Sequence, residues 1–274
     1  MPTIPFTKMH GAGNDFVVID RRDGSDPLPE TLVASIADRH VGVGCDQVVL
    51  IEPPAKGADI RFRFYNADGS EAGACGNGTR CAATMVMREQ ERRDLSIETI
   101  TAVLQADMDS SGCVIVDMGP ACADWREIPL SGDVDTLHLP LEIDGLPHPV
   151  GVGMGNPHCV FIVEDAEAID IERVGPAVEH HTLFPDRTNV EFLSRLGDGR
   201  WRMRVWERGV GVTLACGSGV CAAVVAASRR GLLDARQLEF VVDGGVLSAA
   251  WHENGHVFLG GPVATIFTGL YIGD

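Results

Sequence analysis

The sequence predicts a mixed α/β fold, of the α+β kind, in which one domain occurs twice along 274 residues. The duplication is predicted by a short cysteine-centred motif that occurs once in each half of the chain. In both halves the motif lies between a strand-like segment and a helix-like segment. The motif reads Ala74-Cys75-Gly76-Asn77-Gly78 and then Ala215-Cys216-Gly217-Ser218-Gly219. Four residue pairs keep an offset of 141 or 142 positions: Asn14 with Asn156, Gln47 with Asn189, Asn66 with Glu207, and Cys75 with Cys216. Two such domains, facing each other, would present two thiols to one ligand from opposite sides.

Apolar and alternating runs predict the strands. Residues 16–20 and 48–51 are apolar runs rich in β-branched residues. Residues 61–65 alternate charged and aromatic side chains, as a half-buried strand does, and residues 201–206 alternate in the same way. Further strands are predicted over residues 113–116, 159–163, 238–242 and 256–259.

Helices are predicted directly after the two cysteine-centred motifs. Residues 78–91 are rich in good helix formers, and residues 219–230 are apolar nearly all round, which favours a helix buried within a sheet or barrel. Two more helices are predicted over residues 28–40 and 171–180. Each cysteine-centred motif therefore leads into the start of a helix.

The chain length is typical of two domains. A boundary near Gly119-Pro120 divides it into a first domain of residues 1–118 and a second domain of residues 119–262. Residues 263–274 lie beyond the second copy, and we expect them to form a short strand that returns to the first domain.

The charge balance limits the partners. The net charge is −17, so the chain repels nucleic acids and anionic membranes at long range. An anionic substrate would need local positive groups, such as arginines or helix N-termini. We expect a small-molecule substrate, no nucleic acid and no membrane as partners, and a homodimer is compatible with the sequence.

The apolar stretches are short, and none approaches the roughly 20 residues of a membrane helix. No basic segment followed by an apolar run opens the chain, as a signal peptide would require. We therefore expect a cytoplasmic protein whose eight cysteines are reduced.

The residues also argue against a metal or a cofactor. The Cys-x5-Cys and Cys-x4-Cys spacings of the two motifs differ from the usual zinc pairs. Only two lysines, Lys8 and Lys56, are present as Schiff-base candidates for pyridoxal phosphate, and neither lies in a phosphate-binding context. No dinucleotide or Walker motif is recognisable. We expect neither a metal nor a cofactor.

A thiol at a helix N-terminus is chemically distinctive. The unpaired N–H groups and the helix dipole there favour a thiolate, so we expect lowered pKa values for Cys75 and Cys216. The same N–H groups can hold a carboxylate. Two opposed thiols around a carboxylate-bearing carbon could therefore remove an α-proton from one face and return a proton to the other.

The remaining candidates have simpler interpretations. Cys45, Cys81, Cys113, Cys122, Cys159 and Cys221 are interpreted as small apolar residues. His158 is interpreted as a structural residue, or one that supports the site, rather than as a catalytic base. Asp46 and Asp68 are interpreted as loop or capping residues. A substrate role is expected for Glu207 and Arg208, because Glu207 precedes Cys216 by nine residues as Asn66 precedes Cys75.

At this point the motifs resemble the diaminopimelate epimerase family, from residue 9 to about residue 223. The resemblance rests on these segments: Met9-His10-Gly11-Ala12-Gly13-Asn14-Asp15-Phe16, Tyr65-Asn66-Ala67-Asp68-Gly69-Ser70-Glu71, Ala74-Cys75-Gly76-Asn77-Gly78-Thr79-Arg80-Cys81, Gly155-Asn156-Pro157-His158-Cys159, Trp206-Glu207-Arg208-Gly209 and Ala215-Cys216-Gly217-Ser218-Gly219. It implies two pseudo-symmetric domains, each a β-barrel-like sheet around a central helix. It also implies a cofactor-independent enzyme that interconverts LL- and meso-2,6-diaminopimelate in lysine and peptidoglycan precursor biosynthesis.

The resemblance further implies the site residues. Cys75 and Cys216 would be the acid and base. The substrate site would be lined by Asn14, Gln47, Asn66, Gly76, Asn77, Asn156, Asn189, Glu207, Arg208, Gly217 and Ser218. The sequence departs from the family at Ser218, often Thr, at Leu214, often Gln, and at Val220, often a smaller residue. These departures concern packing near Cys216.

Two alternatives stay open. A proline or hydroxyproline racemase belongs to the same fold group, but such enzymes usually carry His where this chain has Asn77. A redox-sensing protein in which Cys75 and Cys216 form a reversible disulfide is an alternative of another class. The duplicated Asn, Gln and Arg residues favour the epimerase, because a redox switch does not need them.

Overall fold

The computed structural model describes residues 3–55, 57–73, 75–143, 145–233 and 237–273. The chain divides into two compact units, one of Met1–Asp117 with Gly260–Asp274 and one of Met118–Leu259. Strands dominate both units and each contains two helices among its described residues, so the predicted mixed α/β class is confirmed.

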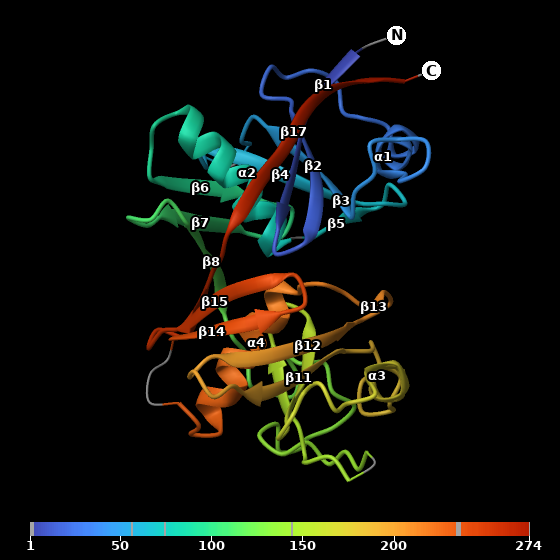
Figure 1. Ribbon diagram of the computed structural model, residues 1–274, viewed down its shortest axis with the longest axis vertical. Helices are drawn as coiled ribbons and strands as arrows, with labels where there is room; N and C mark the ends of the chain where they lie inside the picture. The colour runs from blue at the N-terminus through green and yellow to red at the C-terminus, as the bar shows by residue number, and fades with distance from the viewer. Residues whose placement is uncertain (1–2, 56, 74, 144, 234–236, 274) are drawn as a thin grey trace. The chain divides into compact units, whose positions relative to one another are not determined.

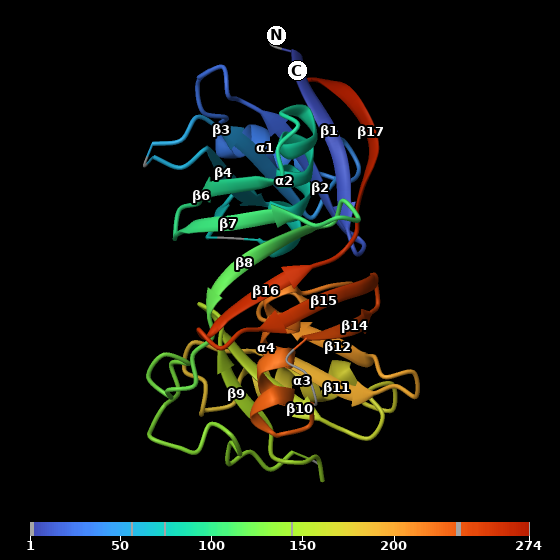
Figure 2. The ribbon, with the colours of Figure 1, turned by 90° about the vertical axis from the view of Figure 1, so that its left-hand side faces the viewer.

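The first unit contains two helices, α1 and α2, among its described residues, and strands form most of its regular structure. Its elements are β1 (Thr3–Gly11), β2 (Asn14–Asp20), α1 (Glu30–Ala37), β3 (Gln47–Glu52), β4 (Ile60–Asn66), β5 (Glu71–Ala72), α2 (Gly76–Glu89), β6 (Asp94–Glu98), β7 (Val103–Met108), β8 (Val114–Pro120), which runs across the boundary, and the terminal strand β17 (Val263–Ile272). The expected terminal strand is thus present, and β17 runs antiparallel alongside β1 (Figure 2).

A tight hairpin places Asn14 at the start of β2. Gly11 on β1 pairs with Asn14, so the turn between the two strands has only two central residues, Ala12 and Gly13. Both have positive φ values, 50° and 81°, as a right-twisted two-residue hairpin requires. From β2 the sheet continues in parallel to β3, antiparallel to β4 and in parallel to β6.

Helix α2 is the core element of this unit. It packs against β1, β2, β3, β4, β6, β7 and β17, so the sheet curls around it (Figure 1). Its residues from Gly76 to Thr84 are all buried. On the other side of the sheet, α1 closes a second apolar cluster that includes Val33, Ile36 and Val48.

The second unit repeats this plan. Its elements are β9 (Val150–Gly153), β10 (Pro157–Ile162), α3 (Ile171–Glu179), β11 (Asn189–Arg195), β12 (Trp201–Glu207), β13 (Gly211–Val212), α4 (Gly217–Arg229), β14 (Gln237–Val242), β15 (Gly245–Trp251) and β16 (His256–Gly260), which ends at the boundary. Helix α4 packs against β9, β10, β11, β12, β14 and β15, and α3 covers β11 and β12 from outside.

The strand register shows the duplication directly. Phe16 pairs with Gln47 between β2 and β3, and His158 pairs with Asn189 between β10 and β11. Both pairings are parallel, and each residue of the second pair lies 142 positions after its counterpart in the first pair. Equivalent side chains therefore occupy equivalent places around α2 and α4.

The predicted elements agree with the structure in type. The four predicted helices are α1 to α4, and the eight predicted strands match β2, β3, β4, β8, β10, β12, β14 and β16. Strands β1, β5, β6, β7, β9, β11, β13 and β15 were not predicted. Within the described residues, every helix is too short or too polar to span a bilayer.

Candidate active site

Cys75 and Cys216, the cysteines of the two repeated motifs, each cap the N-terminus of a helix with the sulfur atom. Cys75 precedes α2, and its Sγ accepts a hydrogen bond from the Gly78 N–H at 3.4 Å. Cys216 precedes α4, and its Sγ accepts from the Gly219 N–H at 3.4 Å. The first N–H groups of a helix have no partner within it, so each thiol lies beside donors suited to a carboxylate or a developing negative charge.

In the first unit, a chain of amides leads to Cys75. Arg80 Nη2 donates to Asn77 Oδ1 at 2.7 Å, and Asn77 Nδ2 donates to Asn14 Oδ1 at 3.3 Å. The same Asn14 oxygen lies 4.0 Å from Cys75 Sγ. The structure thus brings together three of the predicted site residues, Asn14, Asn77 and Cys75.

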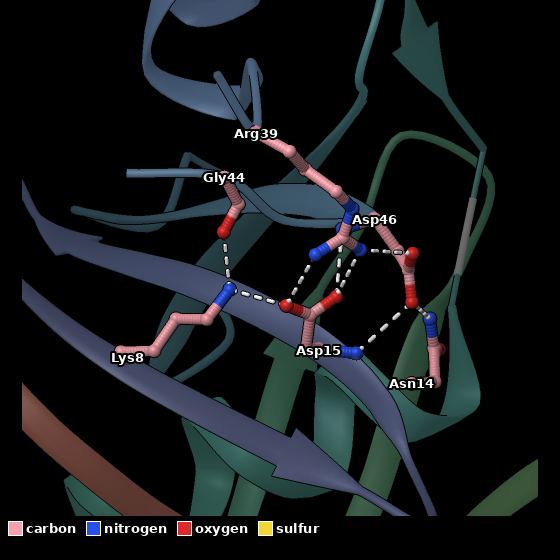
Figure 3. A network of polar contacts seen from close by, with 6 residues as sticks. All are labelled: Lys8, Asn14, Asp15, Arg39, Gly44 and Asp46. Atoms are coloured by element: carbon pink, nitrogen blue, oxygen red, sulfur yellow. Dashed lines mark hydrogen bonds and ion pairs between the residues drawn. The ribbon is translucent and has the colours of Figure 1, made fainter. Parts of the chain in front are cut away.

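Beyond Asn14 lies a network of charged groups (Figure 3). Asn14 Nδ2 donates to Asp46 Oδ2 at 2.7 Å, and the backbone N–H of Asp15 donates to the same oxygen at 3.0 Å. Arg39 bridges Asp15 and Asp46, at 2.7 Å from each. Lys8, which is buried, donates to Asp15 and to the Gly44 carbonyl.

Gln47 and Asn66 form a second polar pair in this unit. They face each other across β3 and β4, and Gln47 Nε2 donates to Asn66 Oδ1 at 3.0 Å. Asn66 in turn donates to Ser70 Oγ at 3.1 Å. Asp68 accepts from the backbone N–H and the hydroxyl of Ser70, as its interpretation as a capping residue predicts.

In the second unit, Cys216 is 6% exposed and lies 3.6 Å from Ser218 Oγ. Burial raises the pKa of the Cys216 thiol well above its ordinary value, and the nearby Glu207 and Glu191 raise this pKa further. The Ser218 hydroxyl and the Gly219 N–H act in the opposite direction but do not outweigh them. The expectation of a lowered pKa is therefore wrong for Cys216, because desolvation exceeds the effect of the helix N-terminus.

A buried polar chain supports Asn156. His158 Nδ1 lies 2.7 Å from Glu191 Oε1, and His158 Nε2 lies 2.9 Å from Asn156 Oδ1. Asn156 Nδ2 then donates to Ser218 Oγ at 3.4 Å. His158 thus contacts an asparagine that contacts Ser218, which agrees with its interpretation as a supporting residue.

Glu207 is the second acid near Cys216, and it is partly exposed. Burial raises the pKa of Glu207, and hydrogen bonds from Thr213 and from the Cys216 side chain oppose this rise. Asn189 Oδ1 accepts from the Arg208 backbone N–H at 3.0 Å, and its Nδ2 donates to the Pro157 carbonyl at 3.0 Å. Arg208 is exposed, and its Nη1 donates to the Asp186 carbonyl at 3.1 Å.

Three residues near the thiols have roles beyond the sequence interpretation. Asp46 is more than a capping residue, because it also holds the Asn14 side chain. Glu191 and Thr213 are contacts of His158 and Glu207 that carried no sequence prediction. A charged residue in the otherwise apolar run 190–193 is the one signal that pointed to Glu191.

Four of the other six cysteines are buried and unsuited to proton transfer. Burial raises the pKa values of Cys45 and Cys81 to about 12, and it raises that of Cys159 well above the ordinary value. Cys221 is fully buried inside α4. These four positions agree with their interpretation as small apolar residues, whereas Cys113 and Cys122 are only partly buried.

Solved structures with the same fold include epimerases and racemases. The chain superposes on a hydroxyproline epimerase from Agrobacterium vitis with a TM-score of 0.69 at 14% identity, covering 98% of this chain and 92% of the other. A phenazine biosynthesis protein of the PhzF family from Bacillus anthracis gives a TM-score of 0.69 at 16% identity, covering 99% and 100% of the two chains. At these identities the likeness concerns the fold alone.

Sequence relatives define the class more closely. The family model described as diaminopimelate epimerase matches residues 6–123 and 150–266. The diaminopimelate epimerase of Rhodospirillum centenum is 54% identical over 267 residues, with 96% of this chain and 91% of that protein covered. The diaminopimelate epimerase of Acidiphilium cryptum is 50% identical, with 97% and 95% covered. The protein is therefore an isomerase of the racemase and epimerase class. The chain belongs to the diaminopimelate epimerase family.

Proposed function

We propose that this enzyme interconverts LL- and meso-2,6-diaminopimelate without a cofactor, and thereby supplies lysine and peptidoglycan precursors. The observation that carries the proposal is the pair of helix-capping thiols, Cys75 and Cys216, at equivalent positions of the two repeats. Membership of the epimerase family supports the same substrate.

In the proposed reaction both thiols act on one α-carbon. A thiolate takes the α-proton: an S–H bond forms, the C–H bond breaks, and the electron pair moves into the carboxylate to give an enediolate-like anion. The other thiol then protonates the opposite face, so that its S–H bond breaks and a new C–H bond forms. The two cysteines end with their protonation states exchanged.

The helix N-termini would stabilise this anion. Backbone N–H groups of Gly76, Asn77, Gly217 and Ser218 would donate to the reacting carboxylate, where each well-placed donor contributes about 3–4 kcal/mol to transition-state stabilisation. The raised pKa of Cys216 in the ligand-free protein calls for compensation, and the ammonium group of the substrate would supply a nearby positive charge.

The other predicted residues would bind the substrate. We assign Asn14, Gln47, Asn66, Asn156, Asn189, Glu207 and Arg208 to this role. Arg208 and the asparagines would bind the distal amino-acid end, which does not react. We also propose two epimerase domains, 1–118 completed by 263–274 and 119–262, in a cytoplasmic enzyme that can form a homodimer.

A comparison of substrates tests the proposal. Reduced protein without added cofactor is incubated with LL-diaminopimelate, L-proline or trans-4-hydroxy-L-proline, and stereoisomers are separated by chiral chromatography. The proposal expects meso-diaminopimelate to form and both proline substrates to remain unchanged, with Arg208→Ala and Asn66→Ala impaired. Turnover of a proline substrate but not of diaminopimelate would refute it.

A further inference from the structure

The two repeats hold their equivalent asparagines in opposite orientations. In the first unit Asn14 directs Oδ1 toward Asn77 and Cys75. In the second unit Asn156 directs Nδ2 toward Ser218, the neighbour of Cys216. Cys75 therefore has the amide oxygen of Asn14 nearby as an acceptor. Cys216 instead lies beside Ser218, which accepts from the amide nitrogen of Asn156.

The Asn14 orientation is fixed by charged groups at both ends of its chain. At one end, the Arg80 guanidinium can only donate, so it must meet the oxygen of Asn77. Asn77 then offers its nitrogen to the oxygen of Asn14. At the other end, the Asp46 carboxylate accepts from the nitrogen of Asn14 (Figure 3). Turning the Asn14 amide over would break both hydrogen bonds.

Asp46 is itself held in place. One carboxylate oxygen accepts from Arg39, and the other accepts from the Asp15 N–H as well as from Asn14. Asp15 Oδ1 accepts a hydrogen bond from the Asp46 backbone N–H at 3.0 Å, and the buried Lys8 forms an ion pair with Asp15. The Asp46 carboxylate, which accepts the hydrogen bond from Asn14, is therefore held in one position.

The second repeat lacks this anchor. Under the common offset, Asp46 corresponds to Thr188, whose hydroxyl donates to the Asn189 carbonyl. The second repeat instead has His158, where the first has the buried Phe16. Each repeat thus anchors its asparagine with a residue that the other does not have.

We propose that Asp46 is a positioning residue for the epimerisation, because it keeps the oxygen of Asn14 turned toward Cys75 and Asn77. This inference rests on the proposed function for its activity readout. The oxygen of Asn14 accepts the Cys75 S–H in the ligand-free protein and is suited to accept an ammonium N–H of the substrate. Without Asp46 the Asn14 amide keeps only the 3.3 Å hydrogen bond from Asn77, so it turns more readily and can direct its nitrogen at the sulfur, which stabilises the thiolate.

The test compares Asp46→Leu, Asp46→Ser and Asp46→Asn in the full-length protein. Leucine removes the acceptor, whereas serine can still cap the Asp15 N–H but is too short to reach Asn14. Asparagine keeps an oxygen for Asn14 and Asp15, and its amino group faces Arg39, which is 54% exposed and can move away. Asp23→Leu is the matched control, because Asp23 is an exposed acceptor for the N–H and the hydroxyl of Ser25 in the same unit.

Two readouts follow from the proposal. For Asp46→Leu and Asp46→Ser, kcat/KM with diaminopimelate falls about tenfold to a hundredfold, as expected when a hydrogen bond to a charged group is lost. The pH at which iodoacetamide labels half of Cys75, measured by peptide mass spectrometry, moves downward in the same two variants. Asp46→Asn and Asp23→Leu keep the wild-type labelling profile, and Asp46→Asn recovers most of the activity.

Several results would overturn the proposal. One is wild-type kcat/KM and a wild-type labelling profile in Asp46→Ser. Another is a loss of kcat/KM in Asp46→Asn equal to that in Asp46→Leu. The third is the same loss of kcat/KM and the same shift in labelling in Asp23→Leu. The labelling experiment needs no turnover. If the wild-type protein failed to epimerise diaminopimelate, the proposed function would fail while the labelling profiles still reported the orientation of Asn14.

Discussion

His158 Nδ1 lies 2.7 Å from Glu191 Oε1, and both side chains are completely buried. The pair lies beneath the start of α4, because a Cβ atom on Gly219 would come within 2.9 Å of Glu191 Oε1. A buried polar pair at this place links the packing of the second repeat to the orientation of Asn156 and to the surroundings of Cys216.

Removal of one partner of this pair should be costly. Glu191→Ala leaves His158 buried opposite a cavity, so we expect the free energy of unfolding to fall by about 3–5 kcal/mol. Glu191→Gln keeps a hydrogen-bonding side chain of the same shape and should cost less than half as much. Guanidinium unfolding of both variants measures the difference, and equal stability of Glu191→Ala and wild type would refute this account.

Glu207→Gln should make Cys216 more acidic. Glu207 contributes to the raised pKa of Cys216, and a neutral amide removes its negative charge. The thiolate is then favoured, so the alkylation profile of Cys216 should move to lower pH. Peptide mass spectrometry after iodoacetamide labelling measures the profile, with Glu172→Gln, an exposed change on α3, as control. A shift to higher pH would contradict the assigned cause.

Gly219→Ala should disturb the thiol cap itself. The added methyl group would lie 2.9 Å from Glu191 Oε1 and 3.3 Å from Cys216 Sγ, which is closer than carbon normally approaches either atom. We expect kcat to fall by at least about tenfold, because misplacing a reacting group by about 1 Å can cost a hundredfold. Gly197→Ala is the control, since its methyl group would meet open space. Equal loss in both variants would assign the effect to general destabilisation.

Asp15 should make stability depend on acid pH. Burial alone would raise the pKa of Asp15, but hydrogen bonds from Arg39 and Lys8 outweigh burial and lower this pKa to about 2. A lowered folded-state pKa gives stability that is present above the unfolded pKa of about 4 and is lost as pH falls toward 2. The shift corresponds to about 2 kcal/mol.

The measurement compares unfolding free energies of wild type and Asp15→Asn at several pH values. Their difference should be largest near neutral pH and should shrink by about 2 kcal/mol between pH 6 and pH 2. A difference that stays constant over this range would show that the Asp15 charge is not responsible.

The sequence carried the local features of the site well. The repeated motif predicted that Cys75 and Cys216 lie at helix starts. The constant offset predicted that Asn14 and Asn156 are equivalent, and the strand register keeps the same offset. These features were readable because helix caps, hairpin turns and strand alternation are set within a few residues of the chain.

Contacts between distant residues were not readable in this way. Asp46 holds Asn14 across 32 positions, and Glu191 meets His158 across 33. The raised pKa of Cys216 depends on burial and on two acids from other strands, so a helix N-terminus alone gave the wrong direction. Long-range packing decides these properties, and a single sequence does not encode it in a local pattern.

The most direct test of the two-thiol mechanism is proton exchange in D2O with single-cysteine variants. Cys75→Ala, Cys216→Ala and wild type are incubated with LL-diaminopimelate, while deuterium incorporation and the meso isomer are followed by NMR. Wild type should form deuterated meso-diaminopimelate, and each variant should epimerise at least about a hundredfold more slowly, because each lacks one of the two proton carriers. Epimerisation by either variant at a rate close to that of wild type would contradict the mechanism.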